Sequence, residues 1–237
     1  MNKPMLRPMI YIAMLFNASV AFSEHAEQTD PLEDINRFFY EVNFNLLDPI
    51  IVKPVAVIYD GLTPKPVRTG LRNFFSNLDE MPSMVNNVMQ GKFSAAGNNA
   101  ARFLLNSTFG LAGIIDVAKG AGLPAGDLED FGQTLAVWGV PAGPYLMLPF
   151  FGPSTVRDAP SNFIDSFLDP FTYNDNLRVR VAVKGIDIIG IRADLLGVDD
   201  VISGDEYLFV RDVYLQNRDY VISDGAIEDD FDDLEDY

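Results

Sequence analysis

The feature that most constrains this chain is a run of 26 consecutive uncharged residues, positions 131–156, between Asp130 and Arg157. A helix of about 20 residues is enough to cross a lipid bilayer. Four prolines and four glycines interrupt the run, however, so a continuous helix is excluded. Backbone broken in this way is tolerated at membrane depth only where protein covers it or where it lines a water-filled cavity. Two interpretations follow: the wall of a cavity at membrane depth, or an aromatic-rich loop buried in the core of a soluble protein.

The composition excludes several classes of function. The 237 residues include 34 acidic and 17 basic side chains, for a formal net charge of -17, so we expect no nucleic acid partner. There is no Cys and a single His, which rules out Cys- and His-ligated metal sites and catalytic relays that need a thiol or an imidazole. Nucleotide-binding glycine motifs and nucleophile elbows are also missing from the sequence. We therefore expect no enzymatic activity, no metal and no cofactor.

Both ends of the chain differ from its body. Residues 1–23 have the pattern of a secretory signal peptide, with positive charge first, a short apolar stretch next and small residues last. We expect cleavage after Ala21 or Ser23, with an uncleaved membrane anchor as the alternative. Residues 224–237 carry eight acidic side chains and no basic one, which predicts a disordered acidic tail. The folded domain is expected to cover residues 24–223.

Apolar periodicity between Pro and Gly breaks predicts a mostly helical body. The expected helices cover residues 31–48, 50–59, 67–78, 82–90, 93–109, 111–119, 128–138, 176–196 and 206–220. The pair Asp48–Pro49 is expected to end the first of them. In the stretch 176–196, valines alternate as in a strand, but its length favours a helix. Because no two-residue turn joins two alternating runs, the predicted fold class is all-α.

Three groups of polar residues allow more than one interpretation. Asp127, Glu129 and Asp130 could form a carboxylate cluster for calcium or acid–base chemistry, but we favour capping of the helix that starts near residue 128. The pair Arg157–Asp158 either closes the uncharged run with an ion pair or lies on the plain surface. Five asparagines either bond between helices in an apolar environment or cover a wet face, and the wet face is favoured. They are Asn86, Asn87, Asn98, Asn99 and Asn106.

Several separate motifs follow one another in order over residues 29–221. They are Asp30-Pro31-Leu32-Glu33, Asn36-Arg37, Asn43-Phe44-Asn45, Leu47-Asp48-Pro49, Lys53-Pro54-Val55-Ala56, Arg72-Asn73-Phe74, Phe131-Gly132-Gln133-Thr134-Leu135, Gly143-Pro144-Tyr145, Leu148-Pro149, Gly152-Pro153-Ser154 and Arg157-Asp158. In this order they resemble the MlaA (VacJ) family of outer-membrane proteins of Gram-negative bacteria. The number and order of the motifs make the resemblance specific.

The resemblance implies a ring-shaped helical body embedded in the outer membrane, with a central amphipathic channel. It implies phospholipid, a trimeric outer-membrane porin and a periplasmic lipid-carrier protein as partners. The implied role is to remove mislocalised phospholipid from the outer leaflet and so to maintain lipid asymmetry. A soluble periplasmic lipid-binding protein and a structural, porin-associated envelope protein remain as alternatives.

The resemblance also implies positions for individual residues. The run 131–156 would supply channel wall and a flexible hairpin, with five residues along the lipid path and six in structural motifs. The path residues are Phe44, Phe131, Tyr145, Leu148 and Phe150, and the motif residues are Asn43, Asn45, Asp48, Pro49, Arg157 and Asp158. Members of this family typically carry an acylated Cys at the end of the signal peptide, which this chain lacks. We therefore expect a non-lipidated protein at the periplasmic face of the outer membrane.

Overall fold

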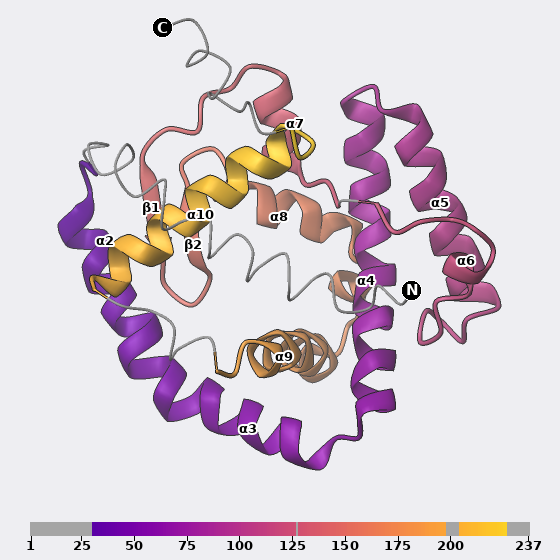
Figure 1. The fold of residues 1–237 in the computed structure, drawn as a ribbon, viewed down its shortest axis with the longest axis horizontal. Helices are drawn as coiled ribbons and strands as arrows, with labels where there is room; N and C mark the ends of the chain where they lie inside the picture. Colours follow the sequence, from indigo (N-terminus) through magenta and orange to yellow (C-terminus); the bar gives the residue numbers. More distant parts are fainter. Residues whose placement is uncertain (1–29, 127, 198–203, 227–237) are drawn as a thin grey trace, which may run out of the picture.

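The computed structural model describes residues 30–126, 128–197 and 204–226. The predicted signal peptide and residues 227–237 of the predicted tail lie outside this part. In Figure 1 the helices follow one another around a ring, and α9 is seen end-on inside it. The described helices are α2 (Glu33–Tyr40), η2 (Glu41–Val52), α3 (Lys53–Leu62), α4 (Lys65–Met89), α5 (Phe93–Thr108), α6 (Val117–Gly120), α7 (Phe131–Val137), α8 (Ser161–Asp165), the short turns Ser166–Leu168 and Pro170–Tyr173, α9 (Leu177–Asp194) and α10 (Glu206–Ile222).

The first helix does not end at Asp48–Pro49, so this prediction was wrong. The elements α2, η2 and α3 form one continuous helical stretch, Glu33–Leu62, along the lower left of the ring. The middle element, η2, is π-helical and contains Pro49. A proline ring clashes with the carbonyl four residues earlier, and the wider π-helical turn relieves that clash. The separate helix predicted for residues 50–59 is therefore part of the same stretch.

Two further helix predictions also failed. The helix α4 runs through Pro82 for 25 residues, where two helices were expected. The helix α5 packs along α4 more extensively than any other two described elements pack together, and this packing outweighs the backbone bond that Pro82 removes. Between residues 111 and 119 only α6 is helical, because Leu111 and Ala112 take positive φ angles of 54° and 59°.

The helices α7, α9 and α10 confirm the predictions for residues 128–138, 176–196 and 206–220. Their starts share one device, since Asp130, Asn176 and Asp205 each accept a backbone N–H with the side chain. The fold is mostly helical, as predicted, but it is not purely α. A two-stranded antiparallel hairpin joins β1 (Tyr145–Leu148) to β2 (Gly152–Thr155) within the uncharged run.

The interface between α4 and α5 is polar. Four of the five asparagines singled out above are buried, so the wet-face prediction was wrong; only Asn98 is partly exposed. Asn87 donates to Asn99 Oδ1 at 3.1 Å, and Asn99 donates to Glu80 at 2.6 Å. Arg102 forms an ion pair with the same Glu80 at 2.6 Å. The two helices are therefore joined by side-chain hydrogen bonds instead of an apolar seam.

The distribution of side chains is the reverse of that in an ordinary soluble protein. Among the described residues, eight buried side chains are apolar or aromatic and eighteen are polar or charged. Thirty-four large apolar side chains are exposed. A soluble protein is expected to bury most of its large apolar side chains, so exposure on this scale indicates a contact with a partner or a membrane.

Candidate functional site

The uncharged run folds into α7, a connecting loop and the β-hairpin. In β1, Tyr145 and Met147 are buried while the side chains between and beside them are half-buried. The strands are joined by residues 149–151, and Phe150 takes a φ angle of 67° followed by Gly152 at 80°. A residue in the left-handed region is the usual way to close a three-residue hairpin loop. Phe150 and Phe151 are each 77% exposed, so the tip of the hairpin presents two aromatic rings to the surroundings.

Two asparagines of the first helical stretch hold the outer edge of β1. Asn36 donates to Tyr145 O at 3.0 Å and accepts from Met147 N at 2.8 Å. Asn43 repeats the pattern, donating to Leu148 O at 2.8 Å and accepting from Phe150 N at 2.9 Å. Each amide therefore makes the same pair of bonds that a neighbouring strand would make, and the open edge of the sheet is covered.

The spacing of the two asparagines fits the spacing of the strand. Asn43 lies seven positions after Asn36, which corresponds to about 10 Å along a helix. The two backbone pairs that they bind are three residues apart, which is also about 10 Å along an extended strand. Helix and strand can therefore run side by side with both amides in register.

A cluster of aromatic side chains lies beneath this edge. Tyr40, Tyr145, Met147 and Tyr207 are buried together, with Phe44 packed against them. The ring of Phe44 stacks on Tyr40 at a centroid distance of 4.8 Å. Tyr145 packs edge-on against Tyr207 from α10 at 6.2 Å. The hairpin is thus fixed from one side by amide bonds and from below by rings.

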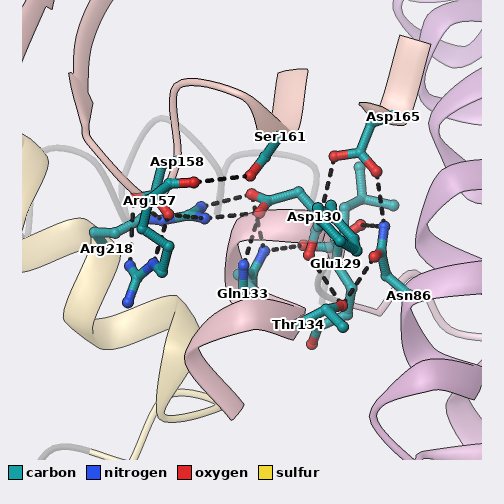
Figure 2. A network of polar contacts seen from close by, with 12 residues as sticks. Asn86, Glu129, Asp130, Gln133, Thr134, Arg157, Asp158, Ser161, Asp165 and Arg218 are labelled. Atoms are coloured by element: carbon teal, nitrogen blue, oxygen red, sulfur yellow. Dashed lines mark hydrogen bonds and ion pairs between the residues drawn. The ribbon is translucent and has the colours of Figure 1, made fainter. Parts of the chain in front are cut away.

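The two ends of the uncharged run meet at one ion-pair network. Figure 2 shows Arg218 of α10 between Asp130, which precedes the run, and Asp158, which follows it. Arg218 Nη2 lies 2.7 Å from Asp130 Oδ1, and Arg218 Nε lies 3.0 Å from Asp158 Oδ2. Arg157 forms a buried ion pair with Asp158 at 2.8 Å, which confirms the ion pair expected there and excludes a plain surface pair. The run therefore leaves and returns to the same polar anchor.

The network keeps both of its carboxyl groups ionised. Burial by itself raises the pKa of Asp130, but the bond and charge of Arg218 outweigh it and hold this pKa below its usual range. The pKa of Asp158 is lowered in the same way, against burial, by Arg157 and Arg218. Gly132 leaves room for this arrangement, because a Cβ atom there would lie 2.4 Å from both Arg218 Nη2 and Asp158 Oδ1.

A second set of contacts fixes α7 to α4, also visible in Figure 2. Asn86 donates to Asp165 Oδ1 at 2.9 Å and accepts from the Thr134 hydroxyl at 2.8 Å. The other oxygen of Asp165 accepts from Phe131 N at 2.9 Å. Burial raises the pKa of Asp165 despite these bonds. The beginning of the run is thereby tied to two separate helices.

The carboxylates near residue 128 do not converge on a common point. Asp130 caps α7, as expected, by accepting from Gln133 N at 2.9 Å. Glu129 is buried and bonds to Gln90 and to Lys92, the latter at 3.0 Å. Asp127 lies outside the described residues. Within the described ranges no group of three or more acidic or His side chains could hold a metal ion.

The structure brings together five of the residues that the sequence singled out. Asn43, Phe44, Tyr145, Leu148 and Phe150 all lie on the hairpin or directly against it. The other predicted residues lie apart from this group. Phe131 packs edge-on against Trp138 in the first part of the run. Asn45 is exposed and bonds to Glu41, and Asp48 pairs with Arg192 at 2.8 Å. Pro49 is exposed within η2.

Sequence reasoning did not assign two residues that matter most to this geometry. Asn36 is 1% exposed and clamps the middle of β1, and Arg218 joins the two ends of the run. The seven-residue spacing between Asn36 and Asn43 could have indicated that the two side chains lie on one face of the helix, two turns apart. Nothing local to Arg218 indicated its partners, which lie 88 and 60 residues away.

The chain was compared with known families and proteins. The sequence model of the family described as "MlaA lipoprotein" matches residues 28–221. The intermembrane phospholipid transport system lipoprotein MlaA of Escherichia coli (strain K12) is 36% identical over 237 residues, covering 94% of each chain. The protein of the same name from Haemophilus influenzae is 31% identical over 215 residues, covering 89% of this chain and 86% of that one.

A solved structure supports the fold. It belongs to work described as "Structural basis for maintenance of bacterial outer membrane lipid asymmetry" and superimposes with a TM-score of 0.74 at 38% sequence identity. The match covers 82% of this chain and 100% of the other.

Proposed function

Because the chain belongs to the MlaA lipoprotein family, we propose that it removes mislocalised phospholipid from the outer leaflet of the outer membrane and passes it to a periplasmic carrier. Two observations support the general role: the relatives are named for intermembrane phospholipid transport, and the similar solved structure is described as a basis for maintaining outer-membrane lipid asymmetry. The direction of transfer and the receiving carrier are the finer parts of the proposal. No catalytic step is required, because moving a lipid breaks no covalent bond.

The reversed distribution of side chains carries this proposal. The stretch Glu33–Leu62 is long and apolar enough to cross a bilayer, and 6% of its most apolar window is buried within the protein. Phe38, Ile50 and Leu62 on this stretch are 62%, 64% and 78% exposed. Water would penalise such a surface, whereas acyl chains would cover it. Apolar side chains on the surface and polar contacts buried between the helices are the arrangement that a protein surrounded by acyl chains needs, which supports a position within the membrane.

We place the lipid path beside the hairpin. Phe44, Tyr145, Leu148 and Phe150 supply aromatic and aliphatic surface there, and Phe131 supplies it at the start of the run. The broken backbone of the hairpin is acceptable at membrane depth because Asn36 and Asn43 satisfy its outer edge. The hairpin tip, with two exposed rings, is the segment that we expect to contact lipid first.

Anchoring is proposed to occur without an acylated cysteine, because the 237 residues contain none. The apolar outside of the ring and a trimeric porin would together hold the protein at the periplasmic face of the outer membrane. Washing isolated outer membranes with alkaline carbonate tests this proposal. The protein should remain in the membrane fraction; its complete release would refute membrane embedding and favour a soluble periplasmic lipid-binding protein.

The transport role is tested by labelling outer-leaflet phospholipid in a strain that lacks the gene. Phospholipid should accumulate there, and the wild-type gene should remove it. Leu148→Asp should fail to restore asymmetry at normal protein level, because a charge would lie beside the lipid path, whereas Leu148→Met should restore it. If deletion changes porin stability but leaves outer-leaflet phospholipid normal, the protein is a structural partner of the porin and the transport proposal is wrong.

A further inference from the structure

Two arginines at the beginning of α9 differ from every other arginine in the described ranges. Eight of the ten arginines there form an ion pair with a carboxylate. Within the described part of the chain Arg178 and Arg180 have no such partner, and both are exposed. The chain carries two acidic side chains for every basic one, so a partner would be easy to supply. The lack of an ion-pair partner for these two arginines within the described ranges therefore requires an explanation.

The stability of α9 does not supply that reason. The N-terminal end of a helix carries partial positive charge, so cations in the first turn are unfavourable. One backbone N–H in the first turn of α9 is already satisfied, because the Asn176 side chain accepts from Arg178 N at 3.0 Å. One turn further along, Lys184 is paired with Asp169 at 2.9 Å. The arginines thus lie where the helix itself would favour acidic residues, which indicates an anion from outside the chain.

The two halves of α9 are held very differently. Its C-terminal half is fixed to the ring, with Arg192 bound to Asp48 and Asp194 bound to Arg72, each at 2.8 Å. Its N-terminal end, residues 177–181, makes no ion pair with the described part of the chain, and Leu177 and Val181 are 65% and 62% exposed. Because Figure 1 looks down the shortest axis of the molecule and shows α9 end-on, this helix runs through the thickness of the ring. Its free end therefore lies toward one face of the ring.

We propose that the free end of α9 binds the phosphates of anionic phospholipids, with Arg178 and Arg180 contacting the headgroups and Leu177, Val179 and Val181 contacting acyl chains. This inference rests on the proposed function and specifies the lipid as one whose headgroup has a net negative charge. An arginine can lay its aliphatic stem along apolar surface while its guanidinium reaches outward, which suits it to a position between acyl chains and headgroups.

Helix geometry sets the number of lipids. Residues two apart project from different sides of a helix, so Arg178 and Arg180 do not converge on one phosphate. Each guanidinium can instead hold the phosphate of a separate lipid by two parallel N–H bonds. A guanidinium is better suited to this bidentate contact than an ammonium. The free end of α9 would thereby collect anionic lipids around it at the face of the ring.

The test compares two double variants with the same change in charge. Arg178→Gln with Arg180→Gln removes the proposed contacts, and Lys65→Gln with Lys119→Gln removes two exposed lysines elsewhere. Full-length protein is floated with vesicles of phosphatidylcholine alone and with vesicles in which about a quarter of it is replaced by phosphatidylglycerol. The measured quantity is the ratio of binding to anionic and to neutral vesicles at physiological salt. Loss of two arginines near an anionic surface should lower it about 30-fold.

The lysine variant should keep the ratio of the wild-type protein. Equal loss in both double variants would reduce the effect to net charge and overturn the proposal, and so would an unchanged ratio in the arginine variant. An unchanged ratio with lost asymmetry in cells would assign the arginines to a protein partner. Outer-leaflet labelling separates this inference from the proposed function. If the wild-type gene does not restore asymmetry but anionic binding still depends on the arginines, the site stands and the transport role fails.

Discussion

Removing the side-chain amide of Asn43 should loosen the tip of the hairpin without unfolding the protein. In Asn43→Ala the carbonyl of Leu148 and the N–H of Phe150 lose the side-chain amide that bonds to them at 2.8 and 2.9 Å. A net contribution of about 1 kcal/mol for each hydrogen bond gives about 2 kcal/mol in total. Opening of the tip should therefore become about 30-fold more frequent. Asn43 is only half-buried, so water can replace the lost bonds when the tip opens.

Amide hydrogen exchange measures this directly. Exchange at Phe150 N should accelerate, whereas exchange along α4 and α5 should remain that of the wild type. Asn45→Ala is the matched control, because Asn45 lies on the same helical stretch but bonds only to Glu41 among the described side chains. Asn43→Asp keeps the acceptor for Phe150 N while it loses the donor to Leu148 O, so its exchange at Phe150 should be intermediate. Unchanged exchange at Phe150 in Asn43→Ala would refute the strand-like role of the amide.

Three further perturbations have defined outcomes. Gly132→Ala should lower the free energy of unfolding by about 2 to 4 kcal/mol, because its Cβ would displace the Arg218–Asp158 pair. Gly97→Ala is the control, because the space around Gly97 is open, and it should leave the stability unchanged or raise it. Thermal denaturation of the two variants measures the difference. The pKa values of Asp130 and Asp158 are lower in the folded state than in the unfolded state, so the two carboxylates contribute to the free energy of unfolding above about pH 4, and this contribution is lost as the pH falls through the folded-state values. In Arg218→Gln the free energy of unfolding, measured by denaturation at a series of pH values, should depend less on pH in the acid range. Arg102→Leu should destabilise by about 3 to 5 kcal/mol, because Glu80 would remain as a buried charge with no guanidinium beside it, and a loss below 1 kcal/mol in denaturant titration would contradict that reasoning.

Local signals identified helices where local energetics decide the structure. Length and apolar periodicity placed α9 and α10, and an acidic cap was predicted near the start of α7. The structure has a side-chain cap at the start of all three helices. Proline was misleading at Pro49 and Pro82, since a π-helical turn absorbs the first and packing against α5 supports the second. Neither the π-helical turn nor the packing against α5 can be predicted from the residues next to the two prolines.

The two strands of the hairpin could not be predicted from the residue pattern, for a different reason. Strands are recognised by apolar and polar residues in alternation, but Tyr145, Leu146, Met147 and Leu148 are all apolar or aromatic. What makes them a strand is a pair of amides more than a hundred residues earlier in the chain, at Asn36 and Asn43. Resemblance to a family supplied the expectation of a hairpin there, and its amide clamp became visible only in three dimensions.

The polar interior and the uncharged run have one physical explanation. If acyl chains surround the ring, apolar contact outside it gives no reason for the helices to stay together, so hydrogen bonds between helices must do so. Asparagine is suited to this role because its amide donates and accepts without carrying a charge, and such amides join α4 to α5, α4 to α7 and α2 to β1. The run 131–156 is held by the same kind of uncharged contact, since Asn86 bonds to Thr134 and Asn36 and Asn43 bond to the backbone of the hairpin. Its prolines and glycines turn the chain back, so that Asp130 before the run and Asp158 after it both reach Arg218. The breaks in the backbone therefore fit a path that begins and ends at one ion-pair network, while neutral amides hold the segment between.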